Sequence, residues 1–144
     1  MPLYTVLIEE GSVPDQTKAK IAEEITNIHT AVMKVPRSFV RVIFLSYPRG
    51  SGYVAGEQAP AAALDCTLRN GHTAEEKAGL LMQVWEMFQR HTGIATDHLA
   101  ISLREIPSTN AMEMGQIMRP VGQESGVEGD RDGLLQRGAG FKST

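Results

Sequence analysis

The chain has 144 residues, of which 42% are hydrophobic and 22% are charged, and its net charge is -3. This length suffices for one domain with a hydrophobic core and is too short for two. The small negative charge gives no reason to expect nucleic acid or an anionic membrane as a partner. The first residues, MPLYTVLIEEG, lack a basic segment before the apolar ones, so we expect no signal peptide.

The first predicted elements are a strand, a helix and a second strand. Residues 3–8 are apolar or β-favouring at nearly every position, which is typical of a strand buried on both faces. Asp15 is the expected N-cap of a helix that ends before Pro36, and residues 40–45 form the next strand. The helix carries one apolar stripe at helical spacing, made of Ile21, Ile25, Ile28 and Val32.

The same order of elements recurs about 60 residues later in the chain. Residues 62–68 are predicted to form a strand, Thr73 to cap a helix that runs to about His91, and residues 99–103 to form another strand. The stripe expected on this helix consists of Lys77, Leu81, Val84 and Phe88. Two such units predict an α+β fold with a tandem β-α-β repeat, in which a four-stranded sheet carries two helices on one face.

One domain, residues 1–120, is expected to hold both units, which span about residues 2–48 and 62–107. The segment between them, residues 49–63, is rich in Gly, Ala and Pro and predicts a loop or a short hairpin. Regular patterns fade after the second unit. We expect residues 121–144 to form an extended C-terminal arm that is flexible or packs on a neighbouring subunit.

Familiar motifs for nucleotide binding, hydrolysis or metal binding are absent from the sequence. The histidines at positions 29, 72, 91 and 98 lack the spacing of metal ligands, and we expect neither a metal nor a cofactor. The single cysteine, Cys66, falls in a predicted strand, which favours a buried structural thiol over a nucleophile. A chain without an internal disulfide fits the reducing cytoplasm, where we expect this protein.

Pro2 is the unusual feature of the sequence. Because the initiator methionine is normally removed before a small residue or proline, the mature chain is expected to begin with a secondary amine on a rigid strand. An α-amino group titrates at about 7.7–8.0. Burial or a neighbouring cation disfavours its charged form and leaves a usable general base near neutral pH. A proline after the initiator methionine also occurs by chance, so Pro2 alone does not decide the function.

A chain that begins Met-Pro on a strand and continues through two β-α-β units resembles the tautomerase superfamily. Further residues resemble its cis-3-chloroacrylic acid dehalogenase branch, whose members use the N-terminal proline, a helix histidine, two arginines, a tyrosine and a glutamate. In the segment ITNIH, His29 falls on the helix histidine. In LRNGH, Arg69 falls on the first arginine, and in EIP followed by MEMG, Glu113 falls on the glutamate.

Two positions depart from the pattern of this branch, because its second arginine falls on His72 and its tyrosine on Ser102. Dehalogenation requires an activated water and a firm hold on the substrate carboxylate, for which paired arginines are well suited. A serine lacks the reach of a tyrosine, and a histidine can be neutral at pH 7. Arg104, on the same strand face as Ser102, compensates in part at most. The departures favour tautomerisation over dehalogenation.

The resemblance implies a keto–enol tautomerase that acts on a small 2-oxo or unsaturated carboxylic acid, with Pro2 and Glu113 as catalytic residues. The residues that it implies for binding the substrate are His29, Arg69, His72 and Ser102. It also implies a homotrimer whose bare sheet faces meet. Ala62 holds the place of Pro2 in the second unit, so we expect one site per chain. Two alternatives stay open: a cis-3-haloacrylate dehalogenase or hydratase, and a non-catalytic trimeric binding protein.

Overall fold

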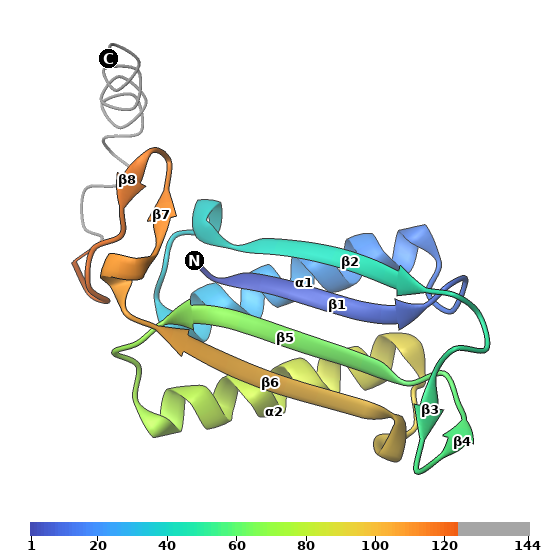
Figure 1. Cartoon of the computed structure of the whole chain (residues 1–144). Helices are drawn as coiled ribbons and strands as arrows, with labels where there is room; N and C mark the ends of the chain where they lie inside the picture. Colours follow the sequence, from blue (N-terminus) through green and yellow to red (C-terminus); the bar gives the residue numbers. More distant parts are fainter. Residues whose placement is uncertain (124–144) are drawn as a thin grey trace.

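The computed structural model describes residues 1–123, in which the predicted repeat is visible as two β-α-β units (Figure 1). The first unit leads from β1 (Leu3–Glu9) through α1 (Asp15–Met33) to β2 (Arg41–Tyr47), with one turn of 3-10 helix at Arg37–Phe39 before β2. Both strands begin at the same end of the sheet, because the helix carries the chain back along the face that it covers.

The second unit repeats this path with β5 (Ala62–Arg69), α2 (Ala74–Thr92) and β6 (Leu99–Ile106). A turn of 3-10 helix again precedes the last strand, at Thr96–His98. The sheet order is β2-β1-β5-β6, and both helices lie on one face of it (Figure 1). The prediction of a four-stranded sheet with two helices on one face is confirmed.

The two inner strands, β1 and β5, run antiparallel, whereas each outer strand is parallel to its neighbour. Thr5 pairs with Asp65, and Leu3 pairs with Thr67. This register relates the two units by an approximate twofold axis that passes between Thr5 and Asp65. The start of β1 therefore lies beside the end of β5, where the N-terminus meets the second unit (Figure 1).

Each unit ends in a short hairpin. β3 (Tyr53–Val54) pairs with β4 (Glu57–Gln58), as the prediction of a loop or short hairpin allowed. β7 (Met112–Glu113) pairs with β8 (Gln116–Ile117), after a 3-10 turn at Ser108–Asn110. The expectation that regular structure fades after the second unit was wrong for this hairpin, which lies beside the N-terminus (Figure 1).

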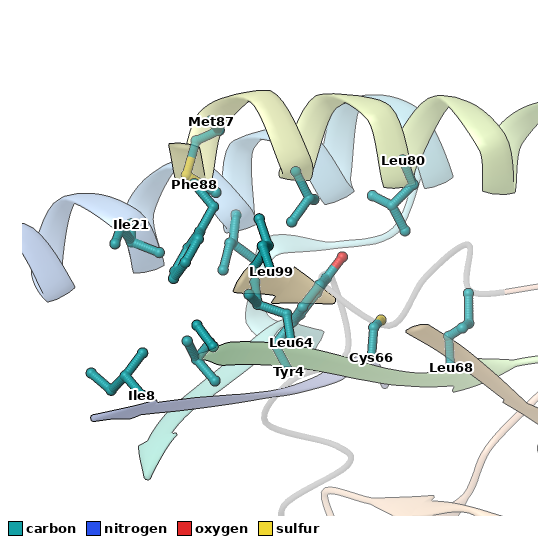
Figure 2. Packing of buried hydrophobic residues seen from close by; sticks show 14 of the residues in the cluster. Tyr4, Ile8, Ile21, Leu64, Cys66, Leu68, Leu80, Met87, Phe88 and Leu99 are labelled. Atoms are coloured by element: carbon teal, nitrogen blue, oxygen red, sulfur yellow. The ribbon is translucent and has the colours of Figure 1, made fainter. Parts of the chain in front are cut away.

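Alternate side chains of the sheet point toward the helices and form the core (Figure 2). The buried residues of the inner strands are Tyr4, Val6, Ile8, Leu64, Cys66 and Leu68. Cys66 is fully buried, and burial raises the pKa of its thiol to about 12, so the prediction of a structural thiol is confirmed. The opposite face of the sheet exposes large apolar side chains, among them Leu7, Ile43 and Leu45.

Helix α1 begins and buries its face differently from the prediction. Pro14, with φ -62°, is the N-cap, and Asp15 is the first helical residue, without a side-chain cap. The residues that α1 buries are Ile21, Ile25, His29 and Met33. Ile28 and Val32 are only partly buried, because the next residues along the helix, His29 and Met33, take the buried positions instead. The expected stripe is thus correct in its first half and displaced by one position in its second.

Helix α2 begins as predicted. The Thr73 side chain accepts a hydrogen bond from the Glu76 N–H, and the Glu76 carboxylate accepts one from the Thr73 N–H, which makes a capping box. The residues that α2 buries are Leu80, Val84, Met87 and Phe88. The inclusion of Lys77 and Leu81 in the buried stripe was wrong, because both side chains are only partly buried. Lys77 instead pairs with Glu105 at 2.7 Å.

None of the helices in the described part of the chain has the length and apolar character that a membrane span requires. The predicted C-terminal arm falls mainly on residues 124–144, which lie outside the described residues, so it stays a prediction. Just before them, Val121 lies against Gly71, whose φ of 111° suits glycine. The chain beyond β8 therefore returns to the turn that follows β5.

Candidate active site

Pro2 lies buried at the start of β1, and its carbonyl oxygen accepts a hydrogen bond from the backbone N–H of Arg41 at 3.1 Å. With Met1 present, the nitrogen of Pro2 is part of an amide, and the α-amino group belongs to Met1. This ammonium group forms an ion pair with the carboxylate of Glu113. The N-terminal amine is thus held in a fixed place by the sheet on one side and by an acid on the other.

Glu113 reaches the N-terminus from the β7–β8 hairpin. The turn of this hairpin has positive φ at both central residues, 52° at Met114 and 75° at Gly115, as a tight two-residue turn requires. The side chain of Glu113 is only 7% exposed, and its Oε1 atom also lies 3.1 Å from Nη1 of Arg41. Its Oε2 atom is buried and has no hydrogen-bond partner within residues 1–123. A buried carboxylate oxygen without a partner is costly unless a ligand or water binds it.

His29 lies in the buried line of α1 and contacts Tyr4 of β1. The Tyr4 hydroxyl and Nδ1 of His29 are 2.8 Å apart, and the two rings meet edge to face at 88°. Burial lowers the pKa of His29 from 6.5 to about 3, and the charges of His72 and the N-terminus add to this effect. His29 is therefore neutral at pH 7, so its ring can take part in hydrogen bonds but does not act as a cation.

Arg69 ends β5, two residues beyond Thr67, which pairs with Leu3 at the start of β1. Its side chain is 1% exposed, and its guanidinium donates a hydrogen bond to the carbonyl oxygen of Arg119. His72 follows in the next turn with a side chain only 3% exposed, and its Nδ1 lies 3.8 Å from Oε2 of Glu76. The segment 69–72 thus brings two of the predicted binding residues to the end of the sheet that holds Pro2.

Ser102 does not join this group within one chain. Its hydroxyl donates a hydrogen bond to Oδ1 of Asp65 at 2.9 Å on the face of the sheet opposite the helices. Arg104 lies on the same face, as predicted, and its Nη2 is 3.3 Å from Oδ2 of Asp65. A role of Ser102 in substrate binding stays a prediction.

Two residues of the site were not predicted from the sequence. Arg41 pairs with Leu3 in the parallel ladder, so its guanidinium lies beside the N-terminus and Glu113. Tyr4, read only as part of an apolar strand, supplies the hydroxyl that contacts His29. The sequence signal for Arg41 was a cation near the start of a strand expected next to β1.

Within residues 1–123 there is no group of three His, Cys, Asp or Glu side chains that could hold a metal ion. The site combines an amine, one buried acid, two arginines and two histidines with buried side chains. These groups suit proton transfer on a small anionic substrate, since they provide a base, a carboxylate and donors for negative charge.

Residues 1–129 match the family model described as putative oxalocrotonate tautomerase enzyme. The structure of N1, a member of the cis-3-chloroacrylic acid dehalogenase (cis-CaaD) family, is 26% identical and superposes with a TM-score of 0.84, covering 96% of this chain and 99% of that one. No curated protein matches the sequence.

Two other solved structures share the fold. Native Ps01740 is 28% identical with a TM-score of 0.75, and the match covers 77% of this chain and 99% of that one. Q0 fused 4-OT, described as a wild-type symmetric trimer, is 24% identical with a TM-score of 0.75 over 84% of this chain and 98% of that one. The chain therefore belongs to the tautomerase superfamily, in the family of putative oxalocrotonate tautomerases, and is similar to its cis-3-chloroacrylic acid dehalogenase branch.

Proposed function

We propose that the protein is a keto–enol tautomerase of small 2-oxo or unsaturated carboxylic acids and that the Pro2 amine is its general base. The observation that carries this proposal is the contact between the N-terminal amine and the buried carboxylate of Glu113. His29 and Arg69 lie buried near the start of β1 and the end of β5. A base and side chains that can bind an anion therefore lie close together at this end of the sheet.

The proposed reaction begins with removal of Met1. The amine then moves by one residue, about 3.8 Å, to Pro2 at the start of the strand. The side chain of Met1 packs against the small cluster of Phe39, Ala111 and Met118, so its removal also opens space for a small substrate next to the amine. The neutral amine takes a proton from the carbon next to the 2-oxo group and returns it to the oxygen, which converts ketone to enol.

The carboxylate of the substrate is proposed to bind Arg69 and Arg41. The Arg41 side chain is 46% exposed, so its guanidinium can accept a second anion while it pairs with Glu113. His72 lies at the same end and adds a ring nitrogen that can bind the anion. Neutral His29 donates a hydrogen bond to the oxygen on which the negative charge of the enolate develops.

A second candidate activity is hydration or dehalogenation of a cis-3-haloacrylate. The buried Oε2 of Glu113 favours it, because this oxygen can accept a proton from a water molecule that attacks the substrate. In this reaction Pro2 is protonated and acts as an acid. Release of halide from cis-3-chloroacrylate, measured beside the rate of ketonisation, distinguishes the two activities.

We further propose a homotrimer in which the bare sheet faces meet. Leu7 is 40% exposed, and Ile43 and Leu45 are each 50% exposed on that face, which is unusual for an isolated small domain. A symmetric trimer is described for the related fold of Q0 fused 4-OT. If the trimer forms without catalysis, the protein is instead a binding module. A location in the cytoplasm also stays a prediction.

Covalent labelling tests the proposed base. 2-Oxo-3-pentynoate is an acetylenic 2-oxo acid whose triple bond can add a neutral amine, so each modified chain gains the mass of one molecule. We expect the label on the peptide that begins at Pro2, with loss of activity in proportion to labelling. Chains that retain Met1 in the same sample serve as the control and should stay unlabelled at Pro2. Full activity after complete modification of Pro2 would refute the proposal.

A further inference from the structure

The pair formed by Tyr4 and His29 has a feature that substrate binding alone does not explain. Both residues are 1% exposed, and the Tyr4 hydroxyl lies 2.8 Å from Nδ1 of His29 (the hydroxyl is visible in Figure 2). The other ring nitrogen, Nε2, has no hydrogen-bond partner within residues 1–123. A neutral imidazole carries one proton, so the contact at Nδ1 decides whether Nε2 donates or accepts.

The internal repeat shows that the fold does not need a polar pair at this place. The residue equivalent to Tyr4 in the second unit, 60 positions later, is Leu64, and the residue equivalent to His29, 59 positions later, is Phe88. Leu64 is 1% exposed and Phe88 is fully buried, and both belong to the hydrophobic core. Two apolar side chains thus fill the same position in the second unit. The polar pair occurs only at the end of the sheet that holds Pro2.

The neighbours of Tyr4 determine the direction of the hydrogen bond. Burial, together with Cys66, raises the pKa of Tyr4 well above its usual value, so the hydroxyl keeps its proton. Between the two groups near this hydroxyl, an imidazole nitrogen is a much stronger acceptor than the thiol of Cys66. The Tyr4 hydroxyl therefore donates to Nδ1 of His29, and the imidazole proton resides on Nε2.

We propose that Tyr4 is a positioning residue that fixes His29 in the Nε2–H tautomer, so that the ring presents an N–H donor to the substrate oxygen. The tautomer assignment rests on the contact and on the stronger acceptor character of the imidazole nitrogen, not on any activity. Only the last step, donation to the developing enolate, rests on the proposed function. Because Nδ1 is already occupied by Tyr4, Nε2 is the only ring nitrogen of His29 left for a ligand.

The ¹⁵N chemical shifts of the His29 ring test the tautomer without any activity. At pH 7 the ring is neutral, since its pKa is about 3, and the shifts report which nitrogen carries the proton. His29→Gln assigns the signals among the four histidines. We expect a protonated Nε2 and an unprotonated Nδ1 in the wild type. In Tyr4→Phe the two shifts should move toward each other, because both tautomers become populated.

The rate of ketonisation shows whether the tautomer of His29 matters for catalysis. In Tyr4→Phe we expect kcat for ketonisation to fall by about tenfold with KM little changed, which is less than the 10²–10³-fold loss on removal of a preorganised donor. Tyr47→Phe is the matched control, because it removes a hydroxyl that donates to the Ala61 carbonyl at 2.6 Å near the far end of β1. The control should change neither the His29 shifts nor the rate.

The possible failures are distinguishable. A wild-type His29 with the proton on Nδ1 overturns the proposal, and this spectrum needs no variant to fold. Unchanged shifts in a folded Tyr4→Phe also overturn it. Altered shifts with an unchanged rate overturn the positioning role. An inactive wild type with the Nε2–H tautomer refutes the proposed tautomerase activity and supports the tautomer assignment.

Discussion

The carboxylate of Glu113 and the guanidinium of Arg41 meet at 3.1 Å and join the β7–β8 hairpin to the first residue of β2. The same carboxylate contacts the N-terminal ammonium group. A cation and an anion from distant parts of the chain therefore lie beside the amine. This pair therefore contributes to the charge around the proposed base.

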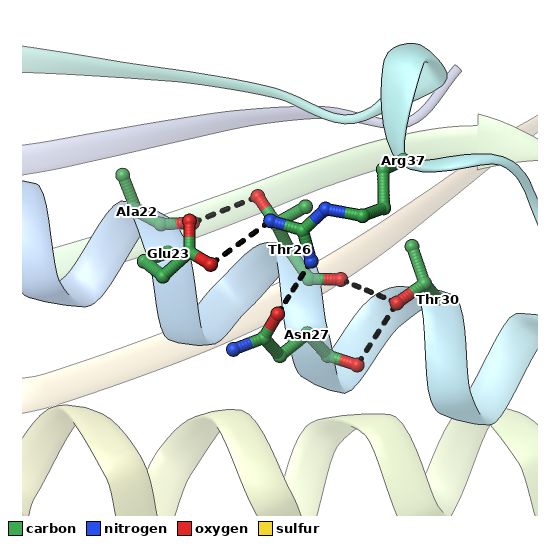
Figure 3. Close-up of polar contacts among 6 residues, drawn as sticks. All are labelled: Ala22, Glu23, Thr26, Asn27, Thr30 and Arg37. Atoms are coloured by element: carbon green, nitrogen blue, oxygen red, sulfur yellow. Dashed lines mark hydrogen bonds and ion pairs between the residues drawn. The ribbon is translucent and has the colours of Figure 1, made fainter.

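Replacement of Arg41 by alanine should lower kcat/KM about 10- to 100-fold, mainly through KM, because a charged hydrogen bond contributes about 1.5–3 kcal/mol. Steady-state ketonisation of phenylpyruvate measures the change. Arg37→Ala is the matched control, since Arg37 is bound to Glu23 at 3.0 Å and Asn27 at 2.5 Å on the surface of α1 (Figure 3). An equal loss of kcat/KM in both variants would contradict a role of Arg41 in substrate binding.

Replacement of Glu113 by glutamine keeps the shape of the side chain and removes its charge. Without the anion beside it, the protonated amine is less favoured, so the acidic limb of the pH–rate profile should shift to lower pH. Any hydratase or dehalogenase activity should be lost, because the amide cannot take a proton from water. A pH–rate limb identical to that of the wild type would contradict contact between Glu113 and the catalytic amine.

The stability of the protein should fall on acidification between pH 6.5 and about 3. In this window an unfolded histidine takes up a proton, whereas buried His29, with its pKa lowered to about 3, does not. The contribution is complete above pH 6.5 and decreases by about 1.4 kcal/mol per pH unit as the pH falls. Urea unfolding across this range measures it. His29→Phe should flatten the slope, and an unchanged slope would show that other groups cause it.

The loss of a polar side chain should lower the free energy of unfolding by different amounts at the starts of the two helices. Thr73→Ala removes the capping box of α2 and should destabilise the protein by about 0.5–2 kcal/mol. Asp15→Ala should cost less, because Asp15 caps nothing and its contact with Lys18 is 3.5 Å long and exposed. Denaturant unfolding of the two variants compares them. A larger effect at Asp15 would contradict the assignment of Pro14 as the N-cap.

The strands, both helices and the cap at Thr73 could be predicted from the sequence because each rests on local periodicity or on one motif. The β7–β8 hairpin was missed although the repeat contains its signal. Gly115 follows Gly56 by 59 positions, and both glycines take positive φ in the turns of equivalent hairpins, 75° and 83°. Extending the repeat to these glycines would have placed Glu113 on a hairpin beside the N-terminus.

The gathering of Pro2 with His29, Arg69 and Glu113 could be anticipated from the resemblance to the superfamily. The roles of Tyr4 and Arg41 could not, since a strand pattern distinguishes only buried from exposed positions. Their contacts depend on the register between β1 and β2 and on the height at which α1 crosses the sheet. Local sequence periodicity does not determine such long-range geometry.

The central claim, catalysis by the Pro2 amine, is tested most directly by the rate of phenylpyruvate ketonisation in wild type and Pro2→Ala. Intact mass spectrometry must first show that Met1 is absent from both samples. Alanine leaves a primary amine that the sheet no longer holds as a rigid ring, and we expect the rate to fall about 10²-fold or more, as on loss of a general base. An unchanged rate in the processed variant would contradict the account.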